Sequence, residues 1–259
     1  MPVALVTGGT AGIGAAFARA LAARGYDLVL VARTADRLEQ SAEELRAGGR
    51  SVEVLVADLA DRADVDRVAE RLRDRARPID LLVNNAGFGL HSKLADPDIA
   101  EHDRALDVMV RALLVLSAAV IPGMRERGHG RIVNVASIAG QLPMGEYSAI
   151  KAWATVYSES LSNELAGSGI TVTALLPGWV HTEFHERAQI RKSSIPGPLW
   201  LNADDLVAAC LRDVDRGRAI SIPSGRYKTL SFLVRHLPRS GVRAVARRIN
   251  QSRRATLTE

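Results

Sequence analysis

The sequence is poor in the residues that stabilise secreted proteins and build membrane spans. Among 259 residues there is one cysteine, Cys210, which excludes an internal disulfide framework and a zinc cluster built on cysteines. The longest stretch that is almost free of charge, ALLVLSAAVIPGM, has about thirteen residues and a proline, and is too short to span a bilayer. Residues 3–7 already have strand character, so we expect no signal peptide and a location in the reducing cytoplasm.

Acidic residues are nearly absent from the C-terminal part. From residue 216 onward there are eleven Lys or Arg residues and one acid, Glu259, although the net charge of the whole chain is only +5. This basic tail carries an apolar stripe at helical spacing: Leu230, Leu233, Val234 and Leu237. Three interpretations are open: docking on the body or a neighbouring subunit, contact with an anionic membrane, or nucleic-acid binding. We expect no nucleic-acid partner, because the tail lacks the interleaved aromatic residues that stack on bases.

Short apolar runs rich in β-branched residues alternate with helical patterns along most of the chain. Such runs suit strands that are buried on both faces of a parallel sheet. The candidate strands are residues 3–7, 27–32, 51–57, 79–84, 131–136, 170–177 and 218–223. The alternation predicts an α/β fold, a single doubly wound, Rossmann-type domain over residues 1–223. Within it, about 183–203 is expected to form a lid, and 224–259 a basic helical extension.

A glycine-rich segment, TGGTAGIG, follows the first predicted strand and opens a helix. Backbone N–H groups at a helix start attract phosphate, and glycines such as Gly8, Gly12 and Gly14 let the chain approach a pyrophosphate closely. A tight strand-to-helix turn without a ligand is the alternative. Because this is the first βα turn of a doubly wound sheet, the segment favours a dinucleotide site.

The residues after the second and third strands bear on which dinucleotide binds. Arg33 stands where an acid would mark NAD, and a guanidinium there can pair with the 2′-phosphate of NADP, with help from the Thr10 hydroxyl. We therefore expect NADP, with NADPH preferred over NADH. Asp58 has two interpretations, a contact to the adenine ring or an N-cap of the next helix. The NNAG segment, residues 84–87, suits a site better than a sheet interior.

Three polar residues predict the reacting centre. Ser137 follows a strand, at the carboxyl end where ligands bind in open α/β sheets. Tyr147 and Lys151 lie four residues apart, so a helix presents them on one face. We expect the Lys151 cation to lower the pKa of the Tyr147 phenol, which then donates a proton to a carbonyl oxygen held by Ser137. A surface pair on an ordinary helix is the alternative for Tyr147 and Lys151.

Taken together, TGGTAGIG, NNAG, Ser137 with YSAIK, and PGWVHT resemble the short-chain dehydrogenases/reductases, over roughly residues 1–185. The resemblance implies a seven-stranded parallel sheet and an NAD(P)(H)-dependent alcohol/carbonyl oxidoreductase. Its catalytic residues are Ser137, Tyr147 and Lys151, of which Tyr147 is the general acid/base. The implied cofactor-binding residues are Gly8, Thr10, Gly12, Ile13, Gly14, Arg33, Asp58, Leu59, Asn84, Ala86, Gly87, Tyr147, Lys151, Pro177, Gly178, Val180 and Thr182. The family usually assembles as a homodimer or homotetramer, here through residues 98–127 and 146–166.

Two departures from the family pattern affect the site. Met109 occupies the position where many members have an asparagine that supports a proton-relay water, so an altered relay is expected. The interval from Ser137 to Tyr147 is about three residues shorter than usual, which reshapes the mouth of the substrate pocket. His181 and His185 have a metal-like spacing, but without a third ligand we expect no metal. Trp179 is a candidate substrate contact.

Two functions remain open from the sequence. The first is an NADP(H)-dependent reductase of a ketone or aldehyde, or the reverse alcohol dehydrogenase. Apolar residues around IPGPLW favour a sizeable hydrophobic small molecule, such as a 3-oxoacyl thioester or a cyclic ketone. The second is a non-catalytic NADP-binding sensor or interaction protein on the same fold. The Ser137, Tyr147 and Lys151 set favours the enzyme, because a protein that only binds the dinucleotide has no need of the serine.

Overall fold

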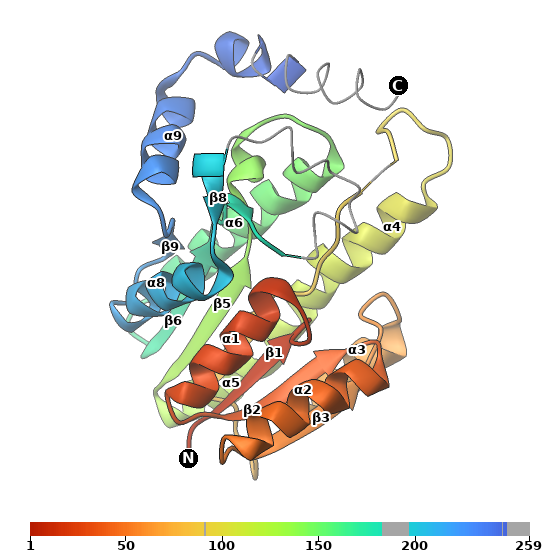
Figure 1. Ribbon diagram of the computed structural model, residues 1–259, viewed down its shortest axis with the longest axis vertical. Helices are drawn as coiled ribbons and strands as arrows, with labels where there is room; N and C mark the ends of the chain where they lie inside the picture. The colour runs from red at the N-terminus through yellow and green to blue at the C-terminus, as the bar shows by residue number, and fades with distance from the viewer. Residues whose placement is uncertain (91, 183–196, 245, 248–259) are drawn as a thin grey trace.

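A seven-stranded parallel sheet forms the centre of the molecule, in the order β3-β2-β1-β4-β5-β6-β9 (Figure 1). The computed structural model describes residues 1–90, 92–182, 197–244 and 246–247. The strands are β1 Val3–Thr7, β2 Asp27–Ala32, β3 Val52–Val56, β4 Leu81–Asn84, β5 Gly130–Val135, β6 Ile170–Leu175 and β9 Ile220–Ser221. All seven predicted strands are confirmed, with ends that differ by at most a few residues.

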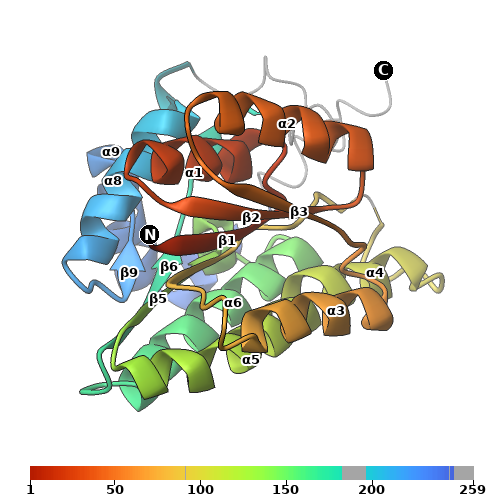
Figure 2. The ribbon, with the colours of Figure 1, turned by 90° about the horizontal axis from the view of Figure 1, so that it is seen from below.

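Helices cover both faces of the sheet, which is why the strands are apolar along their whole length (Figure 2). On β2, Leu28 and Leu30 enter the core on one side, while Val29 and Val31 enter the core on the other. The first side is covered by α1 Gly12–Ala23, α2 Ala35–Ala47 and α8 Ala203–Asp215. The second is covered by α3 Arg62–Arg73, α5 Ala112–Arg127 and α6 Glu146–Glu164.

The strand order reverses next to β1, which pairs with β2 on one side and β4 on the other. The chain therefore leaves β1 in one direction and returns to its opposite edge after β3. In open sheets of this kind, the loops after the two strands separate and leave a crevice for a ligand. The glycine-rich segment and NNAG are the loops that follow β1 and β4.

One long helical segment changes its winding beside the sheet. It begins as α4 Ala100–Leu106, passes through the π-helix η1 Asp107–Arg111 and continues as α5. By length and composition, residues 100–127 could cross a membrane. Leu116, Val120 and Met124, however, are buried against the sheet, so α5 is a core helix of this fold. A π-turn inside an α-helix is rare and is frequent at functional sites, and Met109 lies within this one.

The C-terminal region adds a small sheet that the sequence analysis did not predict, and helices within the segment that it expected to be helical. A two-stranded parallel sheet pairs β7 Trp179–Val180 with β8 Trp200–Leu201, which follows the 3₁₀ turn η4 Gly197–Leu199. Helix α9 spans Gly225–His236, and residues 239–244 are also helical. Of the expected lid, residues 183–196 lie outside the described part of the chain, as do most residues after 244.

Candidate active site

The glycine-rich loop between β1 and α1 is shaped by close backbone contacts. Gly8 has a φ of 65°, in the left-handed region that favours glycine. A Cβ atom on Gly14 would lie 2.1 Å from the Gly8 carbonyl oxygen, so no side chain fits there. The first turn of α1 is therefore held directly against the end of β1.

The N-terminus of α1 is suited to an anion. Its N-cap residue, Ala11, offers no side chain to the free N–H groups, and its first turn contains no acid. Thr10 and Ile13 are half-buried beside it, and the Thr182 side chain lies 3.1 Å from the Cβ position of Gly12. Exposed amide donors, glycines and a hydroxyl residue fit the pyrophosphate of a dinucleotide.

Asn85, which the sequence analysis did not single out, holds NNAG against the glycine loop through hydrogen bonds. Its side-chain amide donates to the carbonyl oxygens of Thr7 and Gly8, at 2.9 and 3.2 Å. In return, the Thr7 hydroxyl accepts hydrogen bonds from the backbone N–H groups of Asn85 and Ala86, at 2.9 and 3.1 Å. The ends of β1 and β4 are thus tied together beside the crevice.

Asn84, a predicted cofactor-binding residue, takes part in a hydrogen-bond network of the interior. Its side chain is buried in the interior and donates to Ser117 Oγ and to Asn134 Oδ1, at 3.1 and 2.9 Å. Asn134 in turn donates to Ser158 Oγ, at 2.9 Å. The Asn84 Nδ2 group therefore joins β4 to α5 and β5, and through Asn134 to α6, while its Oδ1 is buried without a hydrogen-bond partner among the described residues. Of the other two predicted residues of this segment, Ala86 is half-buried and Gly87 is exposed, just after the end of β4.

Asp58 is held by charge at the end of β3. Its carboxylate accepts from Arg104 at 2.7 Å and from the Ala60 N–H at 3.0 Å, while Leu59 beside it is buried. Burial acts to raise the pKa of Asp58, but these hydrogen bonds and the charges of Arg104 and Arg33 bring it below its ordinary value. The N-cap interpretation of Asp58 is wrong, because the N-cap of α3 is Asp61.

Arg33 is exposed at the end of β2 and close enough to Asp58 to affect its pKa. Arg104, which the sequence analysis did not identify, comes from α4 and pairs with the same carboxylate. Asp58, Arg33 and Arg104 thus form a charged cluster at the carboxyl ends of β2 and β3, where the Asp64 carboxylate also accepts from the Asp58 N–H at 2.7 Å. The exposed guanidinium of Arg33 is compatible with an added phosphate.

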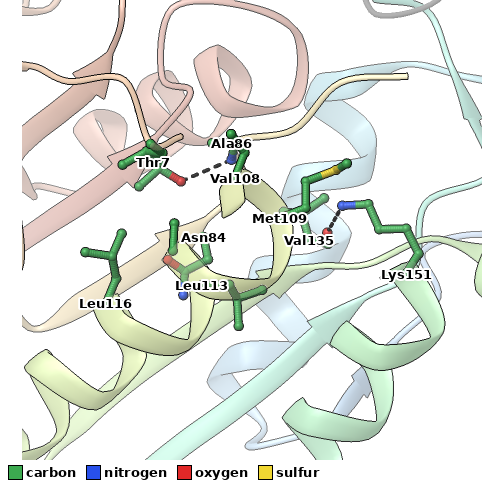
Figure 3. A pocket seen from close by; sticks show the side chains of 11 residues that line it. Thr7, Asn84, Ala86, Val108, Met109, Leu113, Leu116, Val135 and Lys151 are labelled. Atoms are coloured by element: carbon green, nitrogen blue, oxygen red, sulfur yellow. Dashed lines mark hydrogen bonds between the residues drawn. The ribbon is translucent and has the colours of Figure 1, made fainter. Parts of the chain in front are cut away.

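Ser137, Tyr147 and Lys151 converge at the carboxyl end of β5, as the sequence analysis predicted. The hydroxyls of Ser137 and Tyr147 are hydrogen-bonded to each other. Lys151 Nζ lies 5.6 Å from the centroid of the Tyr147 ring and donates to the Val135 carbonyl oxygen at 2.7 Å (Figure 3). Ser137 also caps the short turn η2 Ile138–Gln141, because its Oγ accepts from the Ala139 N–H at 3.1 Å.

The pKa values of this group differ from the expected pattern. Burial raises the pKa of Tyr147 to about 12, and the hydrogen bond with Ser137 acts in the opposite direction. Burial also lowers the pKa of Lys151 to about 8. Desolvation is thus the largest effect on the phenol, and its pKa lies above the ordinary value rather than below it. At neutral pH Tyr147 is therefore a neutral phenol that holds a proton.

Met109 lies where an asparagine was expected to support a proton relay. Its side chain is buried, and its Sδ lies 3.0 Å from the Cβ position of Gly87, with Lys151 Nζ at 3.8 Å from the same point (Figure 3). A thioether sulfur is only a weak hydrogen-bond acceptor. The Met109 side chain therefore fills the space beside Lys151 without replacing the amide of an asparagine. A cavity of about 10 Å³ borders Met109, Lys151 and Asn84.

The PGWVHT segment lies next to the serine. The Pro177 carbonyl oxygen accepts from the Ile138 N–H at 3.0 Å, and Ser137 Oγ lies 3.4 Å from it. Val180 is buried in the core, and Gly178 and Trp179 are half-buried. Of the predicted residues of this segment, Pro177 thus contacts the serine segment directly, whereas Val180 packs in the core.

The metal-like histidine pair is only partly described. His181 is exposed and stacks on Trp200, with ring centroids 4.6 Å apart, while His185 lies outside the described residues. In the described part of the chain, no group of three or more metal-binding side chains is present.

Comparison with known proteins gives a consistent result. A family model described as short chain dehydrogenase matches residues 2–192. A putative ketoacyl reductase of a monensin polyketide synthase, from Streptomyces virginiae, is 41% identical over 192 residues, covering 72% of this chain and 74% of the relative.

Two solved structures are also similar. A short-chain dehydrogenase from Sphingobium yanoikuyae in complex with NADPH has a TM-score of 0.82 and 38% identity, covering 92% of this chain and 97% of its own. A bulky-bulky ketone specific alcohol dehydrogenase from Comamonas testosteroni has a TM-score of 0.77 and 32% identity, covering 92% and 96%.

The buried amine of Lys151 leads to a prediction about stability. Replacement by methionine (Lys151→Met) removes a penalty of about 3 kcal/mol against the charged amine in the folded state. It also removes the hydrogen bond to Val135, worth about 1–2 kcal/mol. We expect the free energy of unfolding at pH 7, measured by urea denaturation, to rise by about 1–2 kcal/mol.

The pH dependence of the stability difference between wild type and Lys151→Met tests whether desolvation of the amine is its cause. Below pH 8 the wild-type lysine is protonated in both states and the full penalty applies. Between pH 8 and 10.5 only the unfolded chain keeps the proton, so wild-type stability rises with pH and the advantage of the variant shrinks. A variant less stable than wild type at pH 7, with a difference independent of pH, would contradict this account.

Proposed function

The chain belongs to the short-chain dehydrogenase/reductase family and is an NAD(P)-dependent oxidoreductase acting on CH–OH and C=O groups; within this class, we propose that it is an NADPH-dependent carbonyl reductase. The observation that carries the proposal is the convergence of Ser137, Tyr147 and Lys151 at the carboxyl end of β5, beside the glycine loop and NNAG. The reverse reaction, oxidation of the alcohol, uses the same residues.

Each of the three residues has a role that follows from its surroundings. When bound, the reduced nicotinamide supplies the hydride that reaches the carbonyl carbon. Tyr147, as a neutral phenol, donates its proton to the carbonyl oxygen. Ser137 hydrogen-bonds the same oxygen and stabilises the charge that develops on it. Lys151, whose pKa of about 8 lies near neutral pH, stabilises the phenolate that remains after the transfer.

The pKa of the phenol affects proton transfer in both directions. A general acid must carry its proton at the start of the step, and burial keeps Tyr147 protonated throughout the physiological pH range. Proton donation then leaves a phenolate, which the same burial disfavours. The hydrogen bond with Ser137 and the amine of Lys151 must therefore stabilise the phenolate as it forms.

The alternative function is a non-catalytic NADP-binding sensor or interaction protein, which Met109 favours because it removes the usual support for a proton relay. Tyr147→Phe separates the two. We expect this variant to bind NADPH with nearly unchanged affinity and to lose at least about 100-fold in kcat, because only the proton donor is removed. NADPH fluorescence titration and absorbance assays on a carbonyl panel measure the two effects. Wild-type rates in the variant would disprove the role of Tyr147, and no turnover by wild type on any carbonyl would favour the sensor.

We propose NADPH as the preferred cofactor on the basis of the Arg33, Asp58 and Arg104 cluster. Arg33 is exposed and keeps its donors available for a 2′-phosphate, whereas Arg104 is engaged with Asp58. Cofactor discrimination then depends on a single charge-assisted contact, whose loss selectively weakens binding of the phosphorylated cofactor.

Arg33→Ala tests this assignment. We expect KM for NADPH to rise about tenfold while KM for NADH changes less than twofold, which corresponds to a loss of about 1.4 kcal/mol. The matched control is Arg37→Ala, an exposed arginine in the first turns of α2. Equal increases in KM for NADPH and NADH in Arg33→Ala would show that Arg33 does not bind the 2′-phosphate.

The proposed substrate is a sizeable hydrophobic ketone or aldehyde, such as a 3-oxoacyl thioester or a cyclic ketone. Trp179 and Trp200 lie with ring centroids 6.2 Å apart beside the turn that follows β6, and offer an apolar wall. The relatives support the same class, since one is named a putative ketoacyl reductase and another is specific for bulky-bulky ketones. We propose that Trp179 contacts the substrate.

Two partners follow from exposed apolar residues. We propose that α5 and α6, which expose Leu114 and Val156, form the interface of a homodimer or homotetramer. We also propose that the outer face of α9 makes a peripheral contact with the cytoplasmic side of an anionic membrane. Leu233 on α9 and Leu237 at its C-cap are exposed, and the tail has no acid before Glu259.

Vesicle co-sedimentation at low salt tests the membrane contact. We expect binding to phosphatidylglycerol vesicles, little binding to phosphatidylcholine vesicles, and at least fivefold weaker binding for the double variant Leu233→Ser/Leu237→Ser. The control is Leu94→Ser, an exposed leucine on the body. Absence of co-sedimentation would end the membrane proposal. If the double variant also sediments as a smaller species in analytical ultracentrifugation, α9 is a subunit contact instead.

A further inference from the structure

Helix α9 reaches the reacting centre through Tyr227, which no part of the sequence analysis assigned to the site. Its ring is buried, with 3% of the residue exposed, although the residue lies in the basic extension. A Cβ atom on Gly178 would lie 1.9 Å from Cζ of this ring. Gly178 has no positive φ that would require glycine, so the Tyr227 ring accounts for the missing side chain.

The hydroxyl of Tyr227 joins two segments that are distant in the sequence. It accepts from the backbone N–H of Trp179 at 3.0 Å and donates to the carbonyl oxygen of Leu199 at 2.7 Å. These residues adjoin β7 and β8, the small sheet beside the site. Tyr227 therefore fixes the turn at residues 177–179 from one side by ring contact and hydrogen bonds.

The opposite side of the same turn is fixed by the catalytic serine's segment. The Pro177 carbonyl oxygen accepts from the Ile138 N–H at 3.0 Å and lies 3.4 Å from Ser137 Oγ. A shift of Pro177 would therefore alter the hydrogen bond from Ser137 Oγ and could move the serine hydroxyl. The turn is held between a catalytic residue on one side and Tyr227 on the other.

A second contact ties α9 to the segment that is short in this chain. Gln141, at the end of η2, donates to Ser231 Oγ at 2.8 Å, and Ser231 is buried. Only residues 142–145 separate η2 from α6. Helix α9 therefore packs against the short segment between β5 and α6.

We infer that Tyr227 is a positioning residue of the active site, holding the 177–179 turn in register with Ser137, and that α9 forms a wall of the substrate pocket. This inference rests on the proposed carbonyl reductase function. The first turns of the C-terminal extension then belong to the active site. Gly178 leaves the space that the Tyr227 ring occupies.

Tyr227→Phe keeps the ring and removes the two hydrogen bonds. We expect kcat/KM for the carbonyl substrate to fall about tenfold and the Kd of NADPH to rise about threefold, with the pH profile of kcat unchanged. The matched control is Tyr157→Phe, which removes a partly buried hydroxyl that is hydrogen-bonded to Ser117 on α5. The control is expected to lower the unfolding temperature without changing either constant by more than twofold.

A double-mutant cycle tests the contact with Gly178. We expect Gly178→Ala alone to lower kcat/KM at least tenfold, because its methyl group meets the Tyr227 ring. In the Tyr227→Ala background, where the ring is absent, the same substitution should cost less than twofold. Circular dichroism and NADPH binding verify that each variant is folded, independently of turnover.

The outcomes separate the inference from the function on which it rests. An active wild type whose Tyr227→Phe variant behaves like the Tyr157→Phe control would overturn the positioning role alone. Equal losses from Gly178→Ala with and without the Tyr227 ring would show that Gly178 serves another contact. A wild type that reduces no carbonyl would instead overturn the proposed function, while the NADPH affinities of the variants would still report whether Tyr227 positions the turn.

Discussion

The site depends on one buried contact, the hydrogen bond from Lys151 Nζ to the Val135 carbonyl oxygen at the end of β5. This bond joins the first turns of α6 to the strand that ends next to Ser137. Because Tyr147 lies one helical turn before Lys151, the same contact brings its hydroxyl to the serine. The three side chains therefore form a unit that is set by a helix docked on a strand end.

Burial of these three side chains lowers the stability of the fold and supports the reaction. Desolvation disfavours the charged forms of both Lys151 and Tyr147, which lowers one pKa and raises the other. A domain of this size is only marginally stable, so desolvation of one buried amine lowers its free energy of unfolding by a substantial fraction. The same dry environment strengthens the electrostatic interactions that act on a developing oxyanion, and it keeps the phenol in its proton-donating form.

The surrounding contacts act on loops at the carboxyl ends of the strands. Asn85 and Thr7 tie the loop after β4 to the loop after β1, and Gly14 lets α1 approach the end of β1. Tyr227 does the same for the turn after β6, from a helix at the other end of the sequence. Each contact constrains backbone, because precise placement of a bound cofactor and carbonyl requires a rigid frame around them.

Much of this molecule is encoded locally in the sequence. The seven strands follow from apolar runs, since a strand buried on both faces needs apolar side chains in both directions, as Leu28 and Val29 show. The glycine loop and the spacing of Tyr147 and Lys151 can likewise be recognised from a few neighbouring residues. For these features the physical requirement acts on neighbouring positions, so the sequence by itself determined them.

Tertiary structure decided what depends on distant neighbours. Asn84 belongs to a segment that suits a ligand site, yet its amide is used in the core because Ser117 and Asn134 lie within reach. The pKa of Tyr147 rises because burial, which no local pattern specifies, outweighs the hydrogen bond with Ser137. Arg104 and Tyr227 join the site from segments far along the chain. Their roles arise only when packing places them there, since a hydrogen bond or a desolvation penalty depends on three-dimensional distance rather than on position in the sequence.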